Sequence, residues 1–131
     1  MPIHAILPRL LPVLLLALPG AALAHAHLTE STPADGAVLS APPSQIELHY
    51  SEAIEPRFST FSLHRLEAAD DDNPRMAPEH RLGDTGADDS NTSITLPVAE
   101  ELPPGHYALA WEVLAADGHT TRGVVRFSLD E

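Results

Sequence analysis

The stretch that decides the fold is GHYALAWEVLAADGHTTRGVVRFSL, residues 105–129. Apolar side chains occupy every second position in its first half, and the same period of two returns near its end. This alternation is typical of strands that place one face in a core. The dipeptide Asp117-Gly118 stands between the halves and favours a tight turn. The segment therefore predicts a hairpin of two antiparallel strands, whose inward side chains are Tyr107, Leu109, Trp111, Val113, Val125, Phe127 and Leu129.

Shorter stretches with the same period precede the hairpin. They are a short strand that opens at Leu28, QIELHYS from Gln45, FSTFSLHRL from Phe58 and SITLPV from Ser93. Prolines and glycines separate them, and no segment after the first 24 residues has a sustained helical period. Ile46, Leu48 and Phe61 are expected to join the core. The pattern predicts an all-β fold: an antiparallel immunoglobulin-like sandwich of about seven strands, with Greek-key connections and a cupredoxin-like shape.

The first 24 residues have the features of a secretory signal peptide. An apolar run follows Arg9, and Ala22 and Ala24 form the small-residue pattern that signal peptidase cuts. The alternative is a membrane anchor, but the run is shorter than the ~20 residues of a spanning helix. We therefore expect residues 1–24 to be removed, residues 25–131 to form one domain, and the protein to reach the periplasm. A second such pattern, Ala24-His25-Ala26, leaves open a cut that would make His27 the first residue.

The charge and the cysteine count exclude several classes of partner and ligand. From residue 25 onward the chain keeps all 19 acidic residues and six of the seven basic ones, a formal charge of −13. Such a surface argues against nucleic acid and anionic lipid and favours cations. There is no cysteine, so neither disulfides nor thiolate ligands are available. We expect a monomer.

Two histidine motifs are candidates for metal binding. Cleavage after Ala24 would give His25 a free α-amine, which chelates a metal together with its own Nδ1. At the predicted turn, Asp117 and His119 are separated by one glycine and can converge on one point. Three nitrogens and one carboxylate oxygen suit Cu(II) in a tetragonal plane. Zinc would accept the same donors in a tetrahedron and is the competing metal.

A rival geometry uses the start of the chain alone. His25-Ala26-His27 offers an amine, two backbone amides and the imidazole of His27, which Cu(II) can bind in a square. Backbone amides that donate to a strand ladder cannot also bind the metal. If Leu28 is a core residue, this arrangement would therefore compete with folding.

The remaining histidines and the acidic stretch 67–91 give no clear functional signal. His49, His64, His80 and His106 are each expected to be solvated surface residues. The acidic stretch contains prolines and glycines. It is interpreted as a long solvated loop, with room for one short edge strand near residues 80–82.

Three stretches carry a resemblance to a known family: HAHLTESTPADGA from His25, IELHYSEAIEP from Ile46 and LPPGHYALAWEVLAADGHTTRGVVRFSL from Leu102. In these stretches the chain resembles the CopC-type periplasmic copper-resistance proteins. The resemblance implies a small β-sandwich that binds Cu(II) and works with a membrane partner, CopD. It implies ligands at His25, Asp117 and His119, and it places Glu52 at the same site in some members. Glu52 and His27 are therefore kept as second-tier candidates.

The chain departs from some members of that family in one respect. Those members carry a methionine-rich loop for Cu(I) in the middle of the chain, whereas the acidic stretch here has only Met76. Soft cuprous copper prefers several thioether or thiolate ligands. We therefore expect one Cu(II) per chain and no Cu(I) methionine site.

These features are compatible with three functions. The first is a copper buffer or carrier for copper homeostasis and resistance, without catalysis. The second is an oxidative enzyme with a copper brace, similar to lytic polysaccharide monooxygenases, but Asp117 would fill a position that oxygen needs. The third is an immunoglobulin-like docking module whose histidines are incidental. The sequence contains no recognisable Ser-His-Asp or paired-carboxylate arrangement, so we expect no enzyme.

Overall fold

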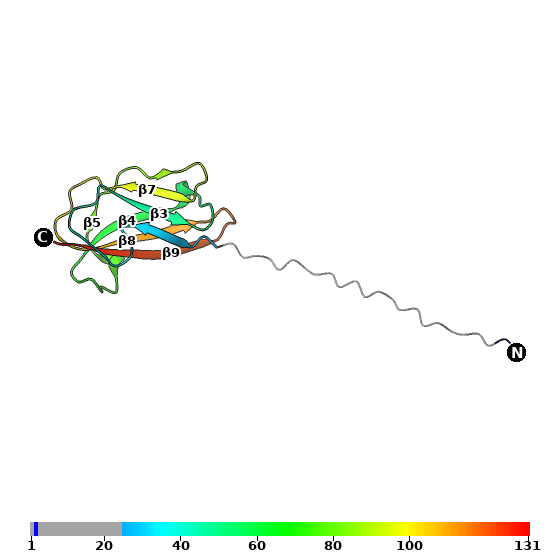
Figure 1. Ribbon diagram of the computed structural model, residues 1–131, viewed down its shortest axis with the longest axis horizontal. Coiled ribbons are helices and arrows are strands. Elements are labelled where there is room, and N and C mark those ends of the chain that lie inside the picture. The colour runs from blue at the N-terminus through cyan, green and yellow to red at the C-terminus, as the bar shows by residue number, and fades with distance from the viewer. Residues whose placement is uncertain (1, 3–24) are drawn as a thin grey trace.

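The computed structural model describes Pro2 and residues 25–131, and the predicted signal peptide lies outside the described residues. The described chain forms two sheets packed face to face (Figure 1). The segment that begins at residue 25 enters the sandwich at one end, where His25 packs against His119, and the C-terminus lies at the opposite end (Figure 1).

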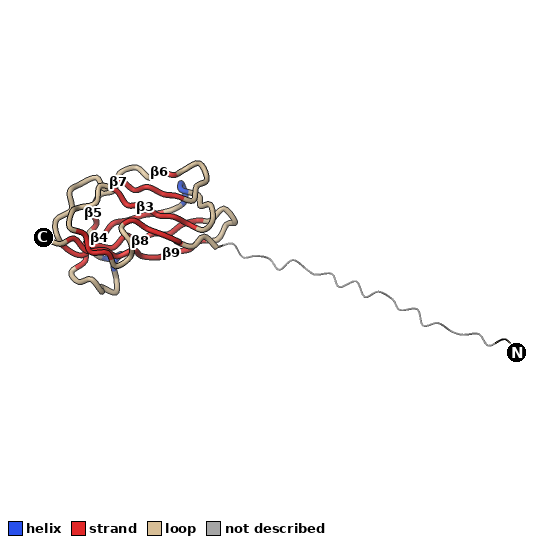
Figure 2. The backbone as a smooth tube through the Cα atoms, in the orientation of Figure 1, coloured by secondary structure: helices blue, strands red, loops and turns tan. Residues whose placement is uncertain are grey.

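Each sheet is built mainly from antiparallel pairs. The first sheet has the order β1 (Leu28–Thr32), β3 (Gln45–Tyr50), β7 (Ser93–Pro97) and β6 (Gly86–Ala87). The second has the order β2 (Ala37–Leu39), β9 (Thr120–Leu129), β8 (Gly105–Leu114), β4 (Thr60–Leu66) and β5 (Glu79–His80). Only β2 and β9 pair in parallel among these strands. Two single 3-10 turns, η1 (Pro56–Phe58) and η2 (Pro74–Met76), interrupt the loops (Figure 2).

The predicted all-β sandwich is confirmed, with a small difference in strand count. The described residues form nine strands, against the expected seven or so. Three strands lie outside the stretches predicted as strands: β2, with three residues, and β5 and β6, which have two residues each and lie within the acidic stretch 67–91. Strands this short carry no readable alternation, so the sequence indicated only that an edge strand could form near residue 80.

The predicted core is present between the sheets. Side chains from both sheets are almost fully buried there, among them Ile46, Leu48, Leu109, Trp111, Val113, Val125 and Phe127. Trp111 is 7% exposed and lies across Gly123 of β9, where an added Cβ would come within 2.4 Å of the indole. Tyr50 of the other sheet packs edge to face on Trp111, with ring centroids 5.4 Å apart. Phe61 is only partly buried, at the margin of this core.

Two expectations about β4 were wrong. The strand begins at Thr60 and not at Phe58, because residues 56–58 form η1, which leaves Phe58 73% exposed. His64 is not solvated and is only 1% exposed. The segment after η2 folds over it, so that its Nδ1 lies 2.9 Å from the Ala77 carbonyl and its Nε2 lies 2.8 Å from Ser62 Oγ.

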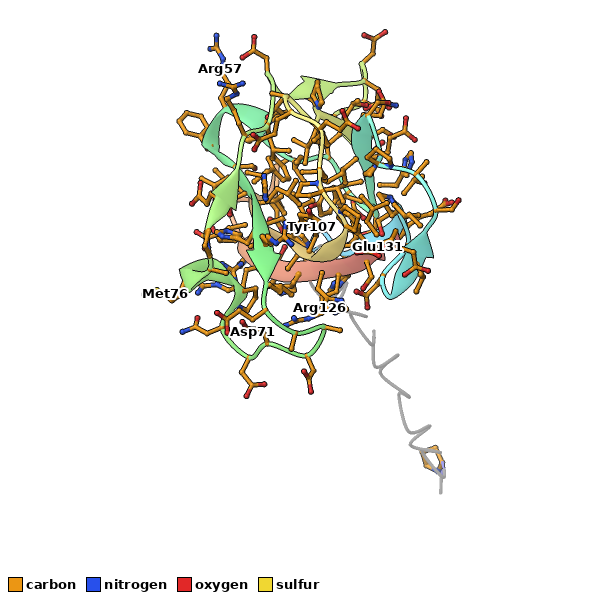
Figure 3. The ribbon with its side chains drawn as sticks, turned by 90° about the vertical axis from the view of Figure 1, so that its left-hand side faces the viewer. Arg57, Asp71, Met76, Tyr107, Arg126 and Glu131 are labelled. Carbon is orange, nitrogen blue, oxygen red and sulfur yellow. The ribbon has the colours of Figure 1, made fainter. Side chains whose placement is uncertain are left out.

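The acidic stretch is more closely attached to the sandwich than a solvated loop would be. Arg75 donates to the backbone carbonyls of Trp111, at 3.2 Å, and Gly123, at 3.4 Å. Figure 3 shows Asp71 and Met76 at the periphery of the molecule and Tyr107 in its interior. In the part of the chain that the structure describes, no helix has the length and apolar character needed to span a membrane.

Candidate metal centre

The turn between β8 and β9 is a short loop held by its own backbone. The Gly118 N–H donates to the Ala115 carbonyl at 2.9 Å, and the Ala115 N–H donates to the His119 carbonyl at 2.8 Å. Gly118 has φ +90°, a backbone conformation that residues other than glycine rarely adopt. A turn closed by a glycine in this conformation continues the two strands in register. It therefore holds Asp117 and His119 at a defined place on the end of the sandwich.

Asp117 uses its two oxygens in different ways. Oδ1 accepts the backbone N–H of His119 at 3.0 Å, and Oδ2 lies 3.1 Å from Nδ1 of the same histidine. The His119 backbone N–H, with smaller contributions from the imidazoles of His119 and His25, lowers the pKa of Asp117 below its ordinary value. A group with a lowered pKa is ionised at neutral pH, so Oδ2 is an anionic donor. The carboxylate therefore caps the turn through Oδ1 and leaves Oδ2 as a candidate metal donor.

His25 reaches this turn from the other end of the chain. Its ring lies edge to face against that of His119, with centroids 4.7 Å apart. One donor atom each from His25, Asp117 and His119 lies within 4.8 Å of the other two. His25 is more than 90 positions from Asp117 and His119 in the chain, so the fold and not local sequence brings it to them. Two imidazoles and a carboxylate form a donor set that fits a divalent metal of the copper and zinc type.

The residues next to His25 are held against both sheets. Ala26 is fully buried, and its carbonyl accepts the hydroxyl of Thr121 at 2.9 Å. The His27 N–H donates to Ser51 Oγ at 2.9 Å, and the His27 carbonyl accepts the Ser51 N–H at 2.8 Å. Because the His27 amide already donates to Ser51, the square arrangement of backbone amides would require this contact to break.

The second-tier candidates lie close by but outside the cluster. His27 is exposed, and its ring centroid is 6.4 Å from that of His25. Glu52 is also exposed. It lies between Ser51, which bonds His27, and Ala53, whose carbonyl accepts the Ala116 N–H at 3.0 Å. Glu52 is therefore beside the turn, without being one of the three residues whose donor atoms converge.

Sequence reasoning missed the residues that hold the start of the domain in place. Ser51 and Thr121 both lie in stretches that the sequence predicts as strands, and neither carries a functional signal. Their hydroxyls contact backbone atoms of residues 25–27, which no periodicity or motif indicates. Within residues 25–131, no second group of three or more histidines and carboxylates converges in this way.

Comparisons with known proteins identify the family and the fold of this chain. The family model described as CopC domain matches residues 28–130, and the chain belongs to that family. Protein YobA of Escherichia coli K12 is 34% identical over 106 residues, which cover 81% of this chain and 79% of YobA. Copper resistance protein C of Pseudomonas syringae pv. tomato is also 34% identical over 106 residues, 81% of each chain. The crystal structure of PcoC, a methionine-rich copper resistance protein from E. coli, superimposes with a TM-score of 0.66 at 27% identity, and covers 82% of this chain and all of PcoC.

Proposed function

We propose that this protein binds one Cu(II) in the periplasm and serves as a copper buffer or carrier in copper homeostasis and resistance. The observation that carries the proposal is the convergence of His25, Asp117 and His119 on one point at the end of the sandwich. Family membership supports copper as the metal, because relatives are named for copper resistance.

The proposed site uses four donors, two of which come from His25. Removal of residues 1–24 would give His25 a free α-amine, and this amine with Nδ1 of the same residue would form a six-membered chelate. His119 supplies a second imidazole and Asp117 an oxygen. Three nitrogens and an oxygen favour Cu(II), which also has the highest affinity among the divalent metals of its row for such donors.

The burial of Ala26 supports cleavage after Ala24 rather than after Ala26. A cut after Ala26 would remove His25 from the site. It would also remove a side chain that is 0% exposed within the core and a carbonyl that accepts the Thr121 hydroxyl. The domain would then lose packing and a metal ligand together.

The presence of a single methionine after the proposed cleavage site favours a Cu(II) site and gives no basis for a Cu(I) site. Met76 is 80% exposed at the edge of the molecule (Figure 3). A single thioether does not make a cuprous site.

We expect copper to be bound and passed on without catalysis, by a monomer that works with a CopD-type membrane protein. An Asp117 oxygen in the copper plane would leave less room for the oxygen ligand that a copper-brace enzyme needs.

Copper titration of the processed protein, monitored by electron paramagnetic resonance, tests the proposal. The expected result is one Cu(II) per chain, with nitrogen hyperfine structure from three nitrogens. Loss of this signal in His119→Ala, with the fold intact by circular dichroism, would support the site. Unchanged binding in both His119→Ala and Asp117→Ala would contradict it. Cleavage of polysaccharide in the presence of peroxide would instead favour the oxidative enzyme.

A further inference from the structure

The start of the domain is fastened by two hydroxyl groups that are not candidate ligands. Ser51 Oγ accepts the His27 N–H at 2.9 Å and donates to the His25 carbonyl at 3.4 Å, so one hydroxyl spans Ala26 on both sides. Thr121 Oγ1 donates to the carbonyl of Ala26 itself at 2.9 Å. Every backbone group in these three contacts belongs to residues 25–27.

The two hydroxyls come from different sheets. Ser51 follows directly on β3 of the first sheet, and Thr121 belongs to β9 of the second. The methyl group of Ala26 is buried in the core between them. The segment therefore lies across the end of the sandwich, tied to both layers. Thr121 is two residues from His119, so its contact fixes the segment against the start of the strand that directly follows the second imidazole.

We propose that Ser51 and Thr121 are positioning residues that hold His25 over the metal site and set the rate at which Cu(II) leaves. We call the contacts of Ser51 and Thr121 with residues 25–27 the clamp. This inference rests on the proposed function, since it assigns a role to residues around the same site.

The physical reason lies in the position of His25 in the processed chain. As the first residue it is attached on one side only, and its ordering costs backbone and side-chain entropy. If the clamp orders residues 25–27 before the metal arrives, this cost no longer falls on binding. His25 would supply two of the four donors, so a metal leaves readily only when the segment detaches. The clamp therefore acts mainly on dissociation.

The test compares two double variants of the processed protein. Ser51→Ala with Thr121→Val removes the clamp hydroxyls. Thr29→Val with Ser31→Ala is the matched control, because these hydroxyls also donate to backbone carbonyls, of His49 at 3.0 Å and Pro33 at 2.9 Å, and make no hydrogen bond to residues 25–27. A net hydrogen bond contributes about 0.5–1.5 kcal/mol, which corresponds to about 2- to 12-fold per hydroxyl.

Two readouts separate the clamp from the site. The first is hydrogen exchange of the His27 amide in the metal-free protein, where we expect protection in the parent and the control and its loss in the clamp variant. The second is the rate of Cu(II) transfer to excess EDTA. We expect release about 10- to 100-fold faster from the clamp variant than from the parent, and a rate like that of the parent in the control.

The outcomes that overturn the inference are distinct from those that overturn the proposed function. Equal copper release from all three proteins overturns the clamp and leaves the copper site standing. An equal acceleration in the control shows general loosening of the fold and also overturns it. An unprotected His27 amide in the metal-free parent also overturns the clamp, and this result needs no copper measurement. A protected amide in a parent that binds no Cu(II) overturns the proposed function, and the copper role of the clamp with it.

Discussion

Two pairs of a histidine and a carboxylate have much in common: one lies in the β8–β9 turn, and the other includes His80 of β5, a strand toward the opposite end of the sandwich (Figure 1). In the β8–β9 turn, His119 Nδ1 is 3.1 Å from Asp117, and on the second sheet's edge His80 Nδ1 is 2.8 Å from Glu100. Each carboxylate also accepts a backbone N–H, from His119 and from Arg81 respectively. In both cases this backbone hydrogen bond is the largest cause of a lowered carboxylate pKa.

The pairs differ in what surrounds the histidine. The His80 side chain is 19% exposed and packs against the ring of Tyr107, with centroids 5.6 Å apart. The His119 side chain is 51% exposed and faces the ring of His25. A short contact and a lowered pKa are therefore not enough to indicate a metal centre. The third donor, brought from the start of the domain, is what distinguishes the turn.

The largest expected effect separates the two pairs by copper affinity. His119→Ala removes a proposed ligand, so we expect Cu(II) affinity to fall by more than about 100-fold, beyond the usual effect of losing an outer partner of a ligand. His80→Ala should leave affinity unchanged. Competition titration against a chromogenic Cu(II) chelator measures both. Equal losses in the two variants would show that the pairs are not functionally distinct.

For folding stability we expect the opposite order, with the larger effect in His80→Ala and the smaller one in His119→Ala. His80→Ala removes the contact with Glu100 and the packing against Tyr107, and should cost about 1–2 kcal/mol of unfolding free energy. His119→Ala removes an exposed ring and keeps the backbone bonds of the turn, so we expect a change within about 0.5 kcal/mol. Urea unfolding of the metal-free proteins measures this. A larger loss in His119→Ala would assign that residue to the fold.

The third prediction separates the two uses of Asp117. In Asp117→Asn the side-chain oxygen can still accept the His119 N–H, so the metal-free melting temperature should stay near that of the parent while Cu(II) affinity falls. Asp117→Ala should lose affinity and also lower the melting temperature, because the cap is gone. Full copper affinity in Asp117→Asn would show that the aspartate only caps the turn.

The sandwich could be predicted from the sequence because its long strands are half-buried and alternate with period two. This alternation predicts Trp111, Leu109 and Val125 in the core, and the structure confirms all three. His64 could not be placed, because its burial depends on the segment around Ala77 folding over β4. Alternation shows which side chains share a face, and it does not show what covers the outer face of a sheet.

The candidate site was predictable only in its parts. Asp117-Gly118-His119 can be recognised as a turn with two donors, and His25 as a possible first residue. Their convergence depends on the packing of the two sheets, and before the structure only the resemblance to a family implied it. The contacts of Ser51 and Thr121 involve backbone atoms of residues 25–27 and leave no signature in residue type.

The smallest expected effect concerns pH and the second pair. The Arg81 N–H, with His80 as a weaker contributor, lowers the pKa of Glu100. Such a group stabilises the fold above its unfolded pKa, and the stabilisation is lost as the pH falls through the folded value. We expect Glu100→Gln to be less stable than the parent at neutral pH, and the difference to shrink below about pH 4.3. Thermal melts across pH 3–7 would show this, and a gap that widens in acid would contradict it.

In the proposed site His25 binds copper through its α-amine as well as its imidazole, and a comparison of Cu(II) dissociation constants tests this most directly. The dissociation constant for Cu(II) is compared between the protein that begins at His25, confirmed by intact mass, and the same protein with one methionine before it. The extension turns the amine into an amide, whose proton is held far more tightly, and leaves the imidazole, Asp117 and His119 in place. We predict that affinity falls by several orders of magnitude. Equal affinity in the two proteins would show that His25 contributes only its side chain and would contradict the account.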